Sequence, residues 1–427
     1  MRIVRADLEI QRQPFARPFA FKGSAFHEKW NLIVRLTDED GTEAVGVGGT
    51  AVLWSDPGVF SNHTEVGGNI LMAALLEFAL QQVTDREFTN PPDLLAELVP
   101  LVHDYGKTVT RNPDLRLTFS LIALVALDNA AWMLHAKRRG IATFDRLIPH
   151  GYRPFLEERQ SRLGLAPAVG YGMPMDELRT ILDTGVYILK IKIGQPGAED
   201  DMVRKDVDWL ERIHRVAAGY NTPMTDSGSV LYYLDANARY GKKESMARLL
   251  DHALKTAIHE HIVLIEEPFA VPDEFDVGDL PARFAADESV QTVEDVYTRA
   301  NQGYGAIAIK PAGKTLSLAF QMVRAAAEAG VPSFVADNGC IPLLVEWNKN
   351  VAARLPGFPG IRGGMIESNG PENYANWDEM LNAYPIPDAP WLTPESGAFV
   401  LDEDYYRHSG GIFLDPAPYS GMFRTIS

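Results

Sequence analysis

The stretch Ile262-Val263-Leu264-Ile265-Glu266-Glu267-Pro268 is an apolar run that ends in an acid and is stopped by a proline. A short, continuous apolar run of this kind is typical of a strand that is buried on both faces, as in a parallel sheet. Similar runs lie on either side of it, separated by amphipathic helical segments. Together the runs are residues 165–168, 187–193, 230–235, 262–266, 283–287, 306–310, 333–337 and 361–367. Eight strands that alternate with helices are the count of a (β/α)8 barrel, so we predict an α/β protein with a TIM barrel.

The rest of the chain has a different organisation. The first 140 residues mix alternating, strand-like stretches with helical ones, which is typical of an α+β domain, and residues 385–427 are rich in Pro, Gly and aromatic residues. We therefore expect three segments: an N-terminal domain at 1–140, the barrel at 141–384, and a C-terminal segment at 385–427 that returns to the N-terminal domain. An open, doubly wound sheet is the competing arrangement, and no Gly-x-Gly-x-x-Gly motif follows an early strand to support it.

The amino-acid composition disfavours some classes of binding partner. The 427 residues include 40 basic and 57 acidic ones, a formal charge of −17 that disfavours nucleic acid. No run approaches the length of an uninterrupted membrane span, so we expect no membrane partner. The single cysteine, Cys340, excludes an internal disulfide, and the N-terminus has no apolar signal core. We expect a cytoplasmic protein.

Three consecutive predicted strands end in an acid, namely Asp235, Glu266 and Asp287. Taken singly, each could be a helix N-cap or a loop acid. The carboxyl ends of barrel strands meet at one mouth, where active sites are built, and three converging carboxylates would repel one another without a cation. Hard oxygen ligands completed by water and substrate describe Mg²⁺, with Mn²⁺ as the alternative ion.

Lysines occupy the corresponding positions on two other strands. In residues 187–193, Leu189 and Ile191 share one face, whereas Lys190 and Lys192 share the other and would point into the barrel. The ordinary alternative is a strand with one solvated face. Lys310 ends the run 306–310, and strands 2 and 6 of eight face each other across a barrel. The predicted layout places amines on both sides of a metal site.

This layout suits removal of a proton α to a carboxylate. The product is an enediolate, and a divalent cation stabilises the negative charge that develops on its oxygens. The base must lose its proton near neutral pH, and we expect Lys190 to lower the pKa of Lys192 by like charge. Two bases on opposite faces allow the proton to leave from one side and return from the other.

The ordered set Lys190-x-Lys192, Asp235, Glu266-Glu267-Pro268, Asp287-Glu288-Ser289 and Lys310 resembles the enolase superfamily, specifically its muconate lactonizing enzyme branch. The resemblance implies a modified barrel with an N-terminal α+β capping domain that the C-terminal segment completes, and often a homo-oligomer. It implies that Asp235, Glu266 and Asp287 bind Mg²⁺, and that Lys192 and Lys310 are the acid/base pair. Lys190 would tune Lys192 or contact the substrate carboxylate, and Asn237 would lie just behind the ligands.

The chain departs from the family pattern in three places. Lys192 and Asp235 are 43 positions apart, and residues 218–229 are expected to form an inserted loop near the mouth. Predicted strand 7 is followed by Asn338-Gly339-Cys340 and has no histidine, which argues against the mandelate racemase branch. Predicted strand 8 ends in Glu367-Ser368-Asn369 rather than the paired aspartates with which dipeptide epimerases hold an α-ammonium.

Substrate contacts are expected from the ends of strands 7 and 8 and from the N-terminal domain, where a mobile loop at residues 19–26 would close over the substrate. The candidate residues are Asn237, Asp337, Asn338, Glu367, Lys22 and Trp54.

Three reactions stay open for a small-molecule carboxylate substrate. The first is a racemase or epimerase that works by 1,1-proton transfer. The second is a lyase, either a dehydratase or a cycloisomerase, on the same enediolate. The third is a metal-free aldolase barrel in which Lys192 or Lys310 forms a Schiff base.

Overall fold

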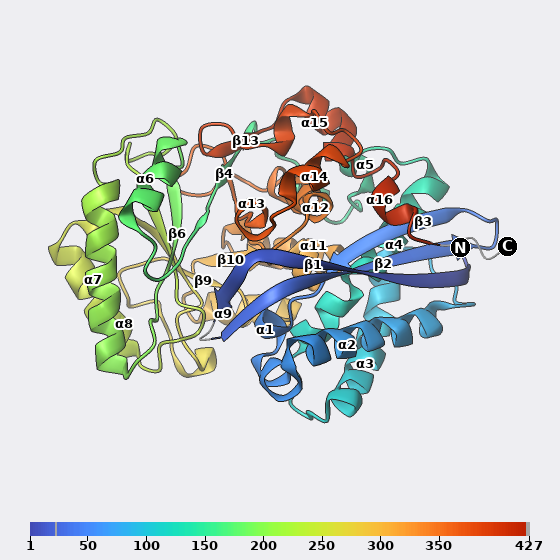
Figure 1. The fold of residues 1–427 in the computed structure, drawn as a ribbon, viewed down its shortest axis with the longest axis horizontal. Helices are drawn as coiled ribbons and strands as arrows, with labels where there is room; N and C mark the ends of the chain where they lie inside the picture. The colour runs from blue at the N-terminus through green and yellow to red at the C-terminus, as the bar shows by residue number, and fades with distance from the viewer. Residues whose placement is uncertain (22–23, 424–427) are drawn as a thin grey trace.

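A closed barrel of parallel strands forms one part of the protein, and the N-terminal domain lies beside it (Figure 1). The computed structural model describes residues 1–21 and 24–423. The first barrel strand is one extended segment in two parts, of which β4 (Arg162–Leu165) pairs with β12 and β5 (Ala168–Val169) pairs with β6. The sheet therefore closes on itself, which confirms the predicted barrel. The other barrel strands are β6 (Ile188–Lys192), β7 (Leu231–Asp235), β8 (Ile262–Glu266), β9 (Phe284–Ala286), β10 (Ala306–Ile309), β11 (Ser333–Val335) and β12 (Gly364–Ile366).

The two faces of each barrel strand have different neighbours. On β6, Leu189 and Ile191 pack into the large core formed with the surrounding helices, whereas Ile188 belongs to a second cluster inside the barrel with Tyr233 and Phe334. Lys190 points to this inner side, as the alternation of the strand predicts. The helices outside are α6 (Met175–Asp183), α7 (Glu199–Ala217), α8 (Lys243–Lys255), α9 (Val293–Asn301), α10 (Pro311–Lys314), α11 (Leu316–Glu328) and α12 (Pro342–Ala352).

The connection between β8 and β9 differs from the expected strand–helix alternation. Its described residues contain no α-helix, only the 3₁₀ turn η3 (Pro272–Glu274). Pro268, Pro272 and Pro281 are spread along this connection, and proline interrupts a helix because it lacks the N–H donor and its ring clashes with the preceding turn. Other short elements around the barrel are α5 (Phe144–Leu147), η1 (Arg153–Phe155), η2 (Ile258–His261), α13 (Gly370–Asn373) and α14 (Trp377–Asn382).

The N-terminal domain is a three-stranded antiparallel sheet packed against helices, as the sequence predicts. Helix α4 lies directly on β3, so closely that a Cβ at Gly46 would be 2.1 Å from the backbone nitrogen of Ala130. The elements, with sheet order β1-β2-β3, are β1 (Ile3–Phe21), β2 (Ser24–Asp38), β3 (Glu43–Gly49), α1 (Val52–Ser55), α2 (Pro57–Val83), α3 (Pro91–Thr110) and α4 (Leu117–Arg139).

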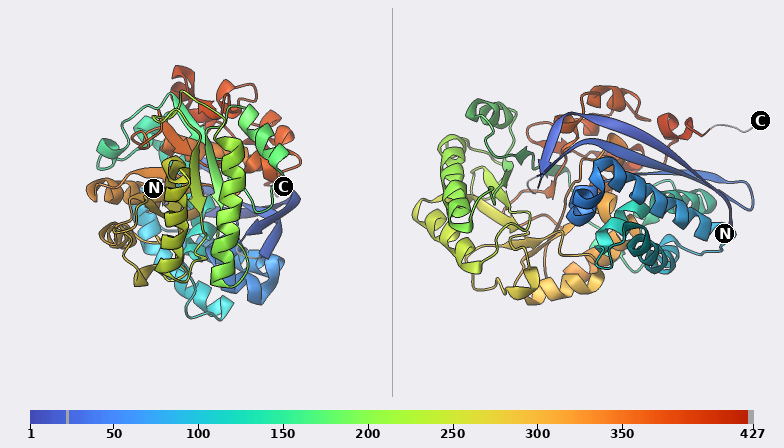
Figure 2. Two further views of the ribbon diagram at one scale, coloured as in Figure 1. Left: turned by 90° about the vertical axis from the view of Figure 1, so that its left-hand side faces the viewer. Right: turned by 60° about the horizontal axis from the view of Figure 1, so that its bottom comes forward.

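The expected loop at residues 19–26 is wrong for the part that the structure describes, because β1 extends to Phe21 and β2 resumes at Ser24. The register of the pair shifts between Pro14 and Phe19, which accommodates prolines that cannot donate to a ladder. The hairpin runs from the N-terminal domain over the barrel (Figures 1 and 2), and a bridge joins Phe15 to Tyr374. Lys22 lies outside the described residues.

The C-terminal segment contacts both parts of the molecule. Strand β13 (Ala398–Val400) adds antiparallel to β4 of the barrel, and Phe423 packs against the Arg35 guanidinium of β2, 4.7 Å from ring centroid to carbon. On these contacts we propose the divisions 1–140, 141–384 and 385–427 as the domains. The remaining elements are η4 (Pro390–Leu392), α15 (Glu403–His408), η5 (Ser409–Gly411) and α16 (Ala417–Ser420).

Two helices, α2 and α4, are long and apolar enough to cross a membrane by length and composition. The most apolar window of α4 is 94% buried inside the protein, as in the central helix of a globular domain, and that of α2 is 50% buried. Their composition is therefore weak evidence for a membrane span.

The expectation that residues 218–229 lie near the mouth is wrong. This loop enters β7 from α7, so it lies at the amino ends of the strands. There the backbone N–H of Asp226 donates to the carbonyl of Gly360 (3.1 Å), and that of Arg362 donates to Met224 (2.9 Å). Gly360 and Arg362 precede β12, so the loop packs beside the amino end of that strand, opposite the carboxyl ends.

A buried carboxylate joins the N-terminal domain to the barrel and gives a pH-dependent prediction. Asp128 of α4 accepts hydrogen bonds from the hydroxyl (2.5 Å) and backbone N–H (2.9 Å) of Ser317. Burial raises the pKa of Asp128 to about 6, against the hydrogen bonds, which lower it. The folded state therefore holds this proton more tightly than the unfolded chain, and stability should fall by ~3 kcal/mol as pH rises from about 4 to about 6. Asp128→Asn should remove this decline in urea unfolding measured across that range, whereas the exposed control Asp251→Asn should keep it.

Candidate active site

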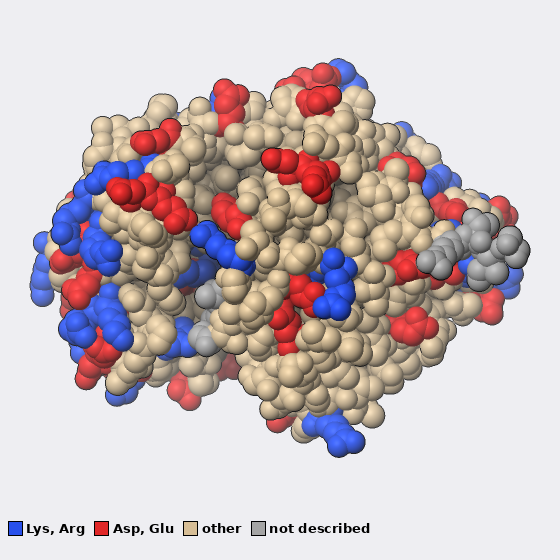
Figure 3. Space-filling model, viewed as in Figure 1, with Lys and Arg blue, Asp and Glu red and all other residues tan. Residues whose placement is uncertain are grey.

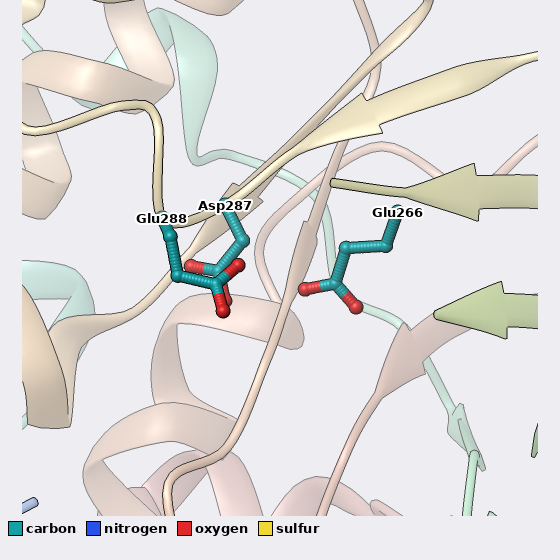
Figure 4. A group of neighbouring side chains, drawn as sticks. All are labelled: Glu266, Asp287 and Glu288. Carbon is teal, nitrogen blue, oxygen red and sulfur yellow. The ribbon is translucent and has the colours of Figure 1, made fainter. Parts of the chain in front are cut away.

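The acids predicted at the strand ends gather at the carboxyl end of the barrel. Asp235 and Glu266 are register partners on β7 and β8, and Asp287 follows β9. One carboxylate oxygen from each of Glu266, Asp287 and Glu288 lies within 4.8 Å of the other two, and all three residues are buried (Figure 4). Asp235 lies outside this group of three, because its Oδ2 faces Lys190 (3.1 Å) and Lys192 (2.5 Å) instead.

The sequence analysis did not include Glu288 among the candidate ligands. Strand alternation would turn it away from Asp287, but β9 ends at Ala286, and beyond that residue the alternation no longer applies. The only signal was its position beside Asp287. Glu267 orders this turn, since its Oε2 accepts hydrogen bonds from the backbone N–H of Asp287 (2.9 Å) and the hydroxyl of Ser289 (3.0 Å).

Lys190 lies among carboxylates from three strands. Its Nζ is 2.8 Å from Glu266, 3.1 Å from Asp235 and 2.9 Å from Glu367, and the residue is 3% exposed. Burial lowers the pKa of Lys190, but the three carboxylates outweigh that effect and raise it well above its ordinary value. Lys190 therefore stays protonated and provides a positive charge at the bottom of the site.

Lys192 lies on the β6 side of the site. Its Nζ donates to Asp235 Oδ2 (2.5 Å) and to Asn237 Oδ1 (3.0 Å). The backbone N–H of Asn237 donates to the other oxygen of Asp235 (3.0 Å). Asn237 and Ala238 both have positive φ, 45° and 60°, a strained conformation for residues other than glycine that concentrates at functional sites.

Lys310 follows β10, four strands from β6. Its Nζ is 2.5 Å from Asp287 Oδ2 and 4.3 Å from the ring centroid of Trp54. Lys314 pairs with the other oxygen of Asp287 (3.2 Å), and the sequence analysis missed it because it lies one helical turn beyond the strand end. Burial lowers the pKa of both lysines, but Asp287, Glu266 and Glu367 raise that of Lys310 overall, whereas that of Lys314 stays lowered.

The acidic group has the properties of a divalent-cation site. Among the described residues, Glu266 Oε1 is buried with no hydrogen-bond partner. Burial and the neighbouring carboxylates raise the pKa of Glu266 well above its usual range, although Lys190 opposes them. A buried acceptor without a donor is costly, and a hard cation among carboxylate oxygens would relieve that cost. The residues present therefore fit Mg²⁺.

Two connected chambers open above these residues. The inner one, of about 50 Å³, is lined by Lys190, Lys192, Asp235, Asp287 and Lys310, and the outer one, of about 590 Å³, begins at Lys192. Figure 3 shows charged side chains gathered around a hollow on this face of the molecule. The inner chamber is also lined by the predicted substrate contacts Trp54, Asn237, Asp337, Asn338 and Glu367.

Some of these predicted contacts are already engaged by the protein. Glu367 Oε2 accepts from Lys190 (2.9 Å) and from the backbone N–H of Asp337 (3.0 Å), and its Oε1 accepts from the Asn369 amide (2.8 Å). Asp337 accepts backbone hydrogen bonds from Cys340 (3.2 Å) and Asn369 (2.8 Å). Both acids hold the loops after strands 7 and 8 in place.

Comparison with solved structures identifies several proteins with a similar fold. The fold is similar to a mandelate racemase/muconate lactonizing protein from Herpetosiphon aurantiacus, with TM-score 0.67, 18% identity, and coverage of 94% of this chain and 96% of that one. It is also similar to the L-Ala-D/L-Glu epimerase from Bacillus subtilis (TM-score 0.65, 16% identity, coverage 88% and 92%). A third is L-talarate dehydratase from Polaromonas sp. JS666, complexed with Mg and L-glucarate (TM-score 0.62, 16% identity, coverage 94% and 92%).

No family model and no curated protein matches the sequence. At identities of 16–18% the likeness of these structures concerns the fold, and the fold that the sequence motifs imply is confirmed. The fold, a barrel with an N-terminal domain packed against it, is similar to that of a solved mandelate racemase/muconate lactonizing protein.

Proposed function

We propose that the protein is an enzyme of the enolase superfamily that removes a proton α to a carboxylate, and that it is a racemase or epimerase. The observation that carries this proposal is that Lys192 and Lys310 line one small chamber from strands four positions apart in the barrel, with the acids between them. The structural neighbours include an epimerase and a Mg-bound dehydratase, which supports the shared first step.

Asp235, Glu266 and Asp287 are the proposed ligands of Mg²⁺. Bound there, the ion would stabilise negative charge on the substrate carboxylate as the α-proton leaves. The solved neighbours that name an ion name Mg, and nothing in the fold or the comparisons favours Mn²⁺.

The chain's own residues supply the proton transfers. Lys192 is the base on one face of the α-carbon, and Lys310 holds the proton on the other face. Lys190 keeps its charge and attracts the substrate carboxylate. Trp54 covers Lys310 at 4.3 Å and keeps water from that side of the chamber.

Two other reactions predict different behaviour. A Schiff-base aldolase needs a neutral lysine and no metal, but Lys310 is paired with a carboxylate that raises its pKa, and the acidic group has no part in imine formation. A lyase would share the first proton transfer and then lose a leaving group. We further propose a cytoplasmic homo-oligomer that acts on small carboxylates and does not bind nucleic acid or membranes.

Proton exchange tests the proposal. Purified protein in D₂O should incorporate deuterium at the α-carbon of a suitable carboxylate with no loss of a leaving group, and EDTA should reduce the rate by about 100-fold or more, reversibly with Mg²⁺. The panel should hold amino-acid derivatives, dipeptides and sugar acids. Loss of a leaving group would indicate the lyase instead. Borohydride trapping of a carbonyl substrate in EDTA would indicate the aldolase.

A further inference from the structure

The outer chamber contains an arginine that the reaction described above does not use. Arg239 is half-buried and lines this chamber four residues after Asp235, on the same strand-to-helix connection. The positive φ values of Asn237 and Ala238 turn the chain so that Arg239 follows at the chamber wall. Gly194 makes room for it, since a Cβ at that glycine would come within 2.5 Å of the Arg239 Cβ.

The backbone around Arg239 is held in place from both sides. The buried carboxylate of Asp206 accepts hydrogen bonds from the backbone N–H of Gly194 and from the hydroxyl of Tyr240, both at 2.7 Å. The backbone N–H of Ala238 donates to the carbonyl of Glu267 (2.6 Å), and that of Tyr240 donates to Pro268 (3.1 Å). The backbone position of Arg239 is therefore set before any ligand binds, so that only its side chain has to be ordered on binding.

The charge of Arg239 has no counter-ion in the described part of the chain. The second arginine of the chamber, Arg17, pairs with Glu177 at 3.5 Å, and Lys192 pairs with Asp235. Arg239 forms no salt bridge with any described residue. Glu372, the other acid that lines this chamber, is not paired with it either. A half-buried guanidinium without a partner fits an incoming oxyanion, because its planar fork matches a carboxylate in two parallel hydrogen bonds.

The two chambers would hold two different parts of a substrate. The inner chamber has space for a carboxylate and the reacting carbon, and Trp54 lies over Lys310 at one side of it. The outer chamber, of about 590 Å³, begins at Lys192 and Asn237 and is far larger than one amino-acid-sized acid requires. A substituent of the α-carbon of a substrate bound in the inner chamber would extend past Lys192 toward Arg239.

We propose that Arg239 binds a second anionic group of the substrate, so that the enzyme prefers carboxylic acids whose α-substituent ends in a distal carboxylate. This inference rests on the proposed function, because it assumes that the first carboxylate binds in the inner chamber. It assigns Arg239 to specificity and leaves the proton transfers to the lysines.

Matched pairs of compounds test the proposal. Each pair, one of N-acyl amino acids and one of 2-hydroxy acids, has the same chain ending either in a carboxylate or in a carboxamide. The full-length protein with Mg²⁺ should favour the carboxylate member by about tenfold or more in kcat/KM for α-proton exchange, mainly through KM. Arg239→Gln should reduce the ratio of kcat/KM between the carboxylate and carboxamide members to about one. Arg239→Lys should retain part of the preference for the carboxylate.

Two control variants separate a specific contact from a general loss of positive charge. Arg215→Gln removes an exposed arginine on α7, far from the chamber, and should leave the ratio unchanged. Arg17→Gln removes the arginine already paired with Glu177 and should reduce the ratio less than Arg239→Gln does.

The outcomes distinguish this inference from the proposed function. Equal rates for both members of each pair, or a preference that survives in Arg239→Gln, would overturn the inference while exchange itself upholds the function. If no compound exchanges, calorimetry with Mg²⁺ still decides: tighter binding of the carboxylate member that depends on Arg239 supports the inference and counts against the function. No preference in binding either would overturn the inference.

Discussion

Lys310→Met is expected to stop racemisation and to leave hydrogen exchange working from one face of the substrate only. The variant keeps Lys192, so the enantiomer whose α-proton faces Lys192 should still exchange with solvent, whereas the other should not. A general acid/base is worth about 10²–10⁴-fold, and we expect racemisation to fall by about 10³-fold or more. Asp287 still pairs with Lys314 in this variant, so the fold should be retained.

Lys192→Met should give the mirror image, with exchange of the opposite enantiomer only. The measurement is deuterium incorporation into each pure enantiomer by NMR, together with chiral chromatography of the product. Full turnover by Lys310→Met would contradict a two-base mechanism and favour a lyase with a single base.

Lys314→Met is the matched comparison for Lys310. Both lysines pair with Asp287, but only Lys310 lines the chamber. A lysine that acts only through Asp287 should change exchange from the two faces alike, whereas a base should change one face. A one-sided defect in Lys314→Met would show that the assignment of Lys310 as the second base is wrong.

The barrel and the positions of the strand-end acids and lysines could be predicted because strands obey simple periodicity. Buried parallel strands are short apolar runs, so an acid or lysine at the end of such a run is conspicuous, as with Glu266 and Lys310. The inward direction of Lys190 follows from period-2 alternation with Leu189 and Ile191.

What the sequence analysis missed lies where periodicity ends. Glu288, Lys314 and Arg239 all follow the last residue of a strand, and their directions depend on turns and on left-handed residues such as Ala238. The error over residues 218–229 has another cause. The length of a loop shows that it is an insertion, but only its place between a helix and the following strand shows which end of the barrel it occupies.

The length of the strands in the β1–β2 hairpin was underestimated for a related reason. Pro14 and Pro18 argue against a continuous strand, and the structure accommodates them through a register shift that local sequence does not encode. Since this hairpin carries Phe19 and Phe26 to the inner chamber, the part of the substrate site that comes from the N-terminal domain could not be predicted in detail.

The proposed metal ligands should differ sharply in what they contribute to folding. Asp287 is the partner of two buried lysines, Lys310 (2.5 Å) and Lys314 (3.2 Å). Asp287→Asn removes the charge of the carboxylate with which both ammonium groups pair, and breaking a buried pair in this way costs about 3–5 kcal/mol. The metal-free variant should therefore unfold at clearly lower urea concentration than the parent protein, in addition to losing activity.

Glu266→Gln should behave in the opposite way. One oxygen of Glu266 is buried without a hydrogen-bond partner among the described residues, and Asp235, Asp287 and Glu367 surround it with like charge. An amide removes that repulsion and still accepts a hydrogen bond from Lys190, so the metal-free variant should be as stable as the parent or more so. Activity should nevertheless be lost, together with the stabilisation by Mg²⁺.

Urea unfolding of EDTA-treated protein, with and without added MgCl₂, measures both effects at once. Stabilisation by a bound ion follows from its affinity for the folded state, so a variant that lacks a ligand should show little shift on addition of Mg²⁺. Retention of the full shift in Glu266→Gln would exclude Glu266 as a ligand.

The same measurement decides between Asp235 and Glu288 as the third ligand. The sequence motifs favour Asp235, whereas the described geometry groups Glu288 with Glu266 and Asp287. We expect Asp235→Asn to abolish the Mg²⁺-dependent shift and Glu288→Gln to keep most of it.

Lys190 and Lys192 pair with Asp235 in this structure, so a cation that binds Asp235 must compete with two ammonium groups. That competition would free Lys192 from its ion pair, which is the state that a base requires. If Glu288→Gln abolished the shift instead, Glu288 would be the third ligand, and Asp235 would only pair with the two lysines.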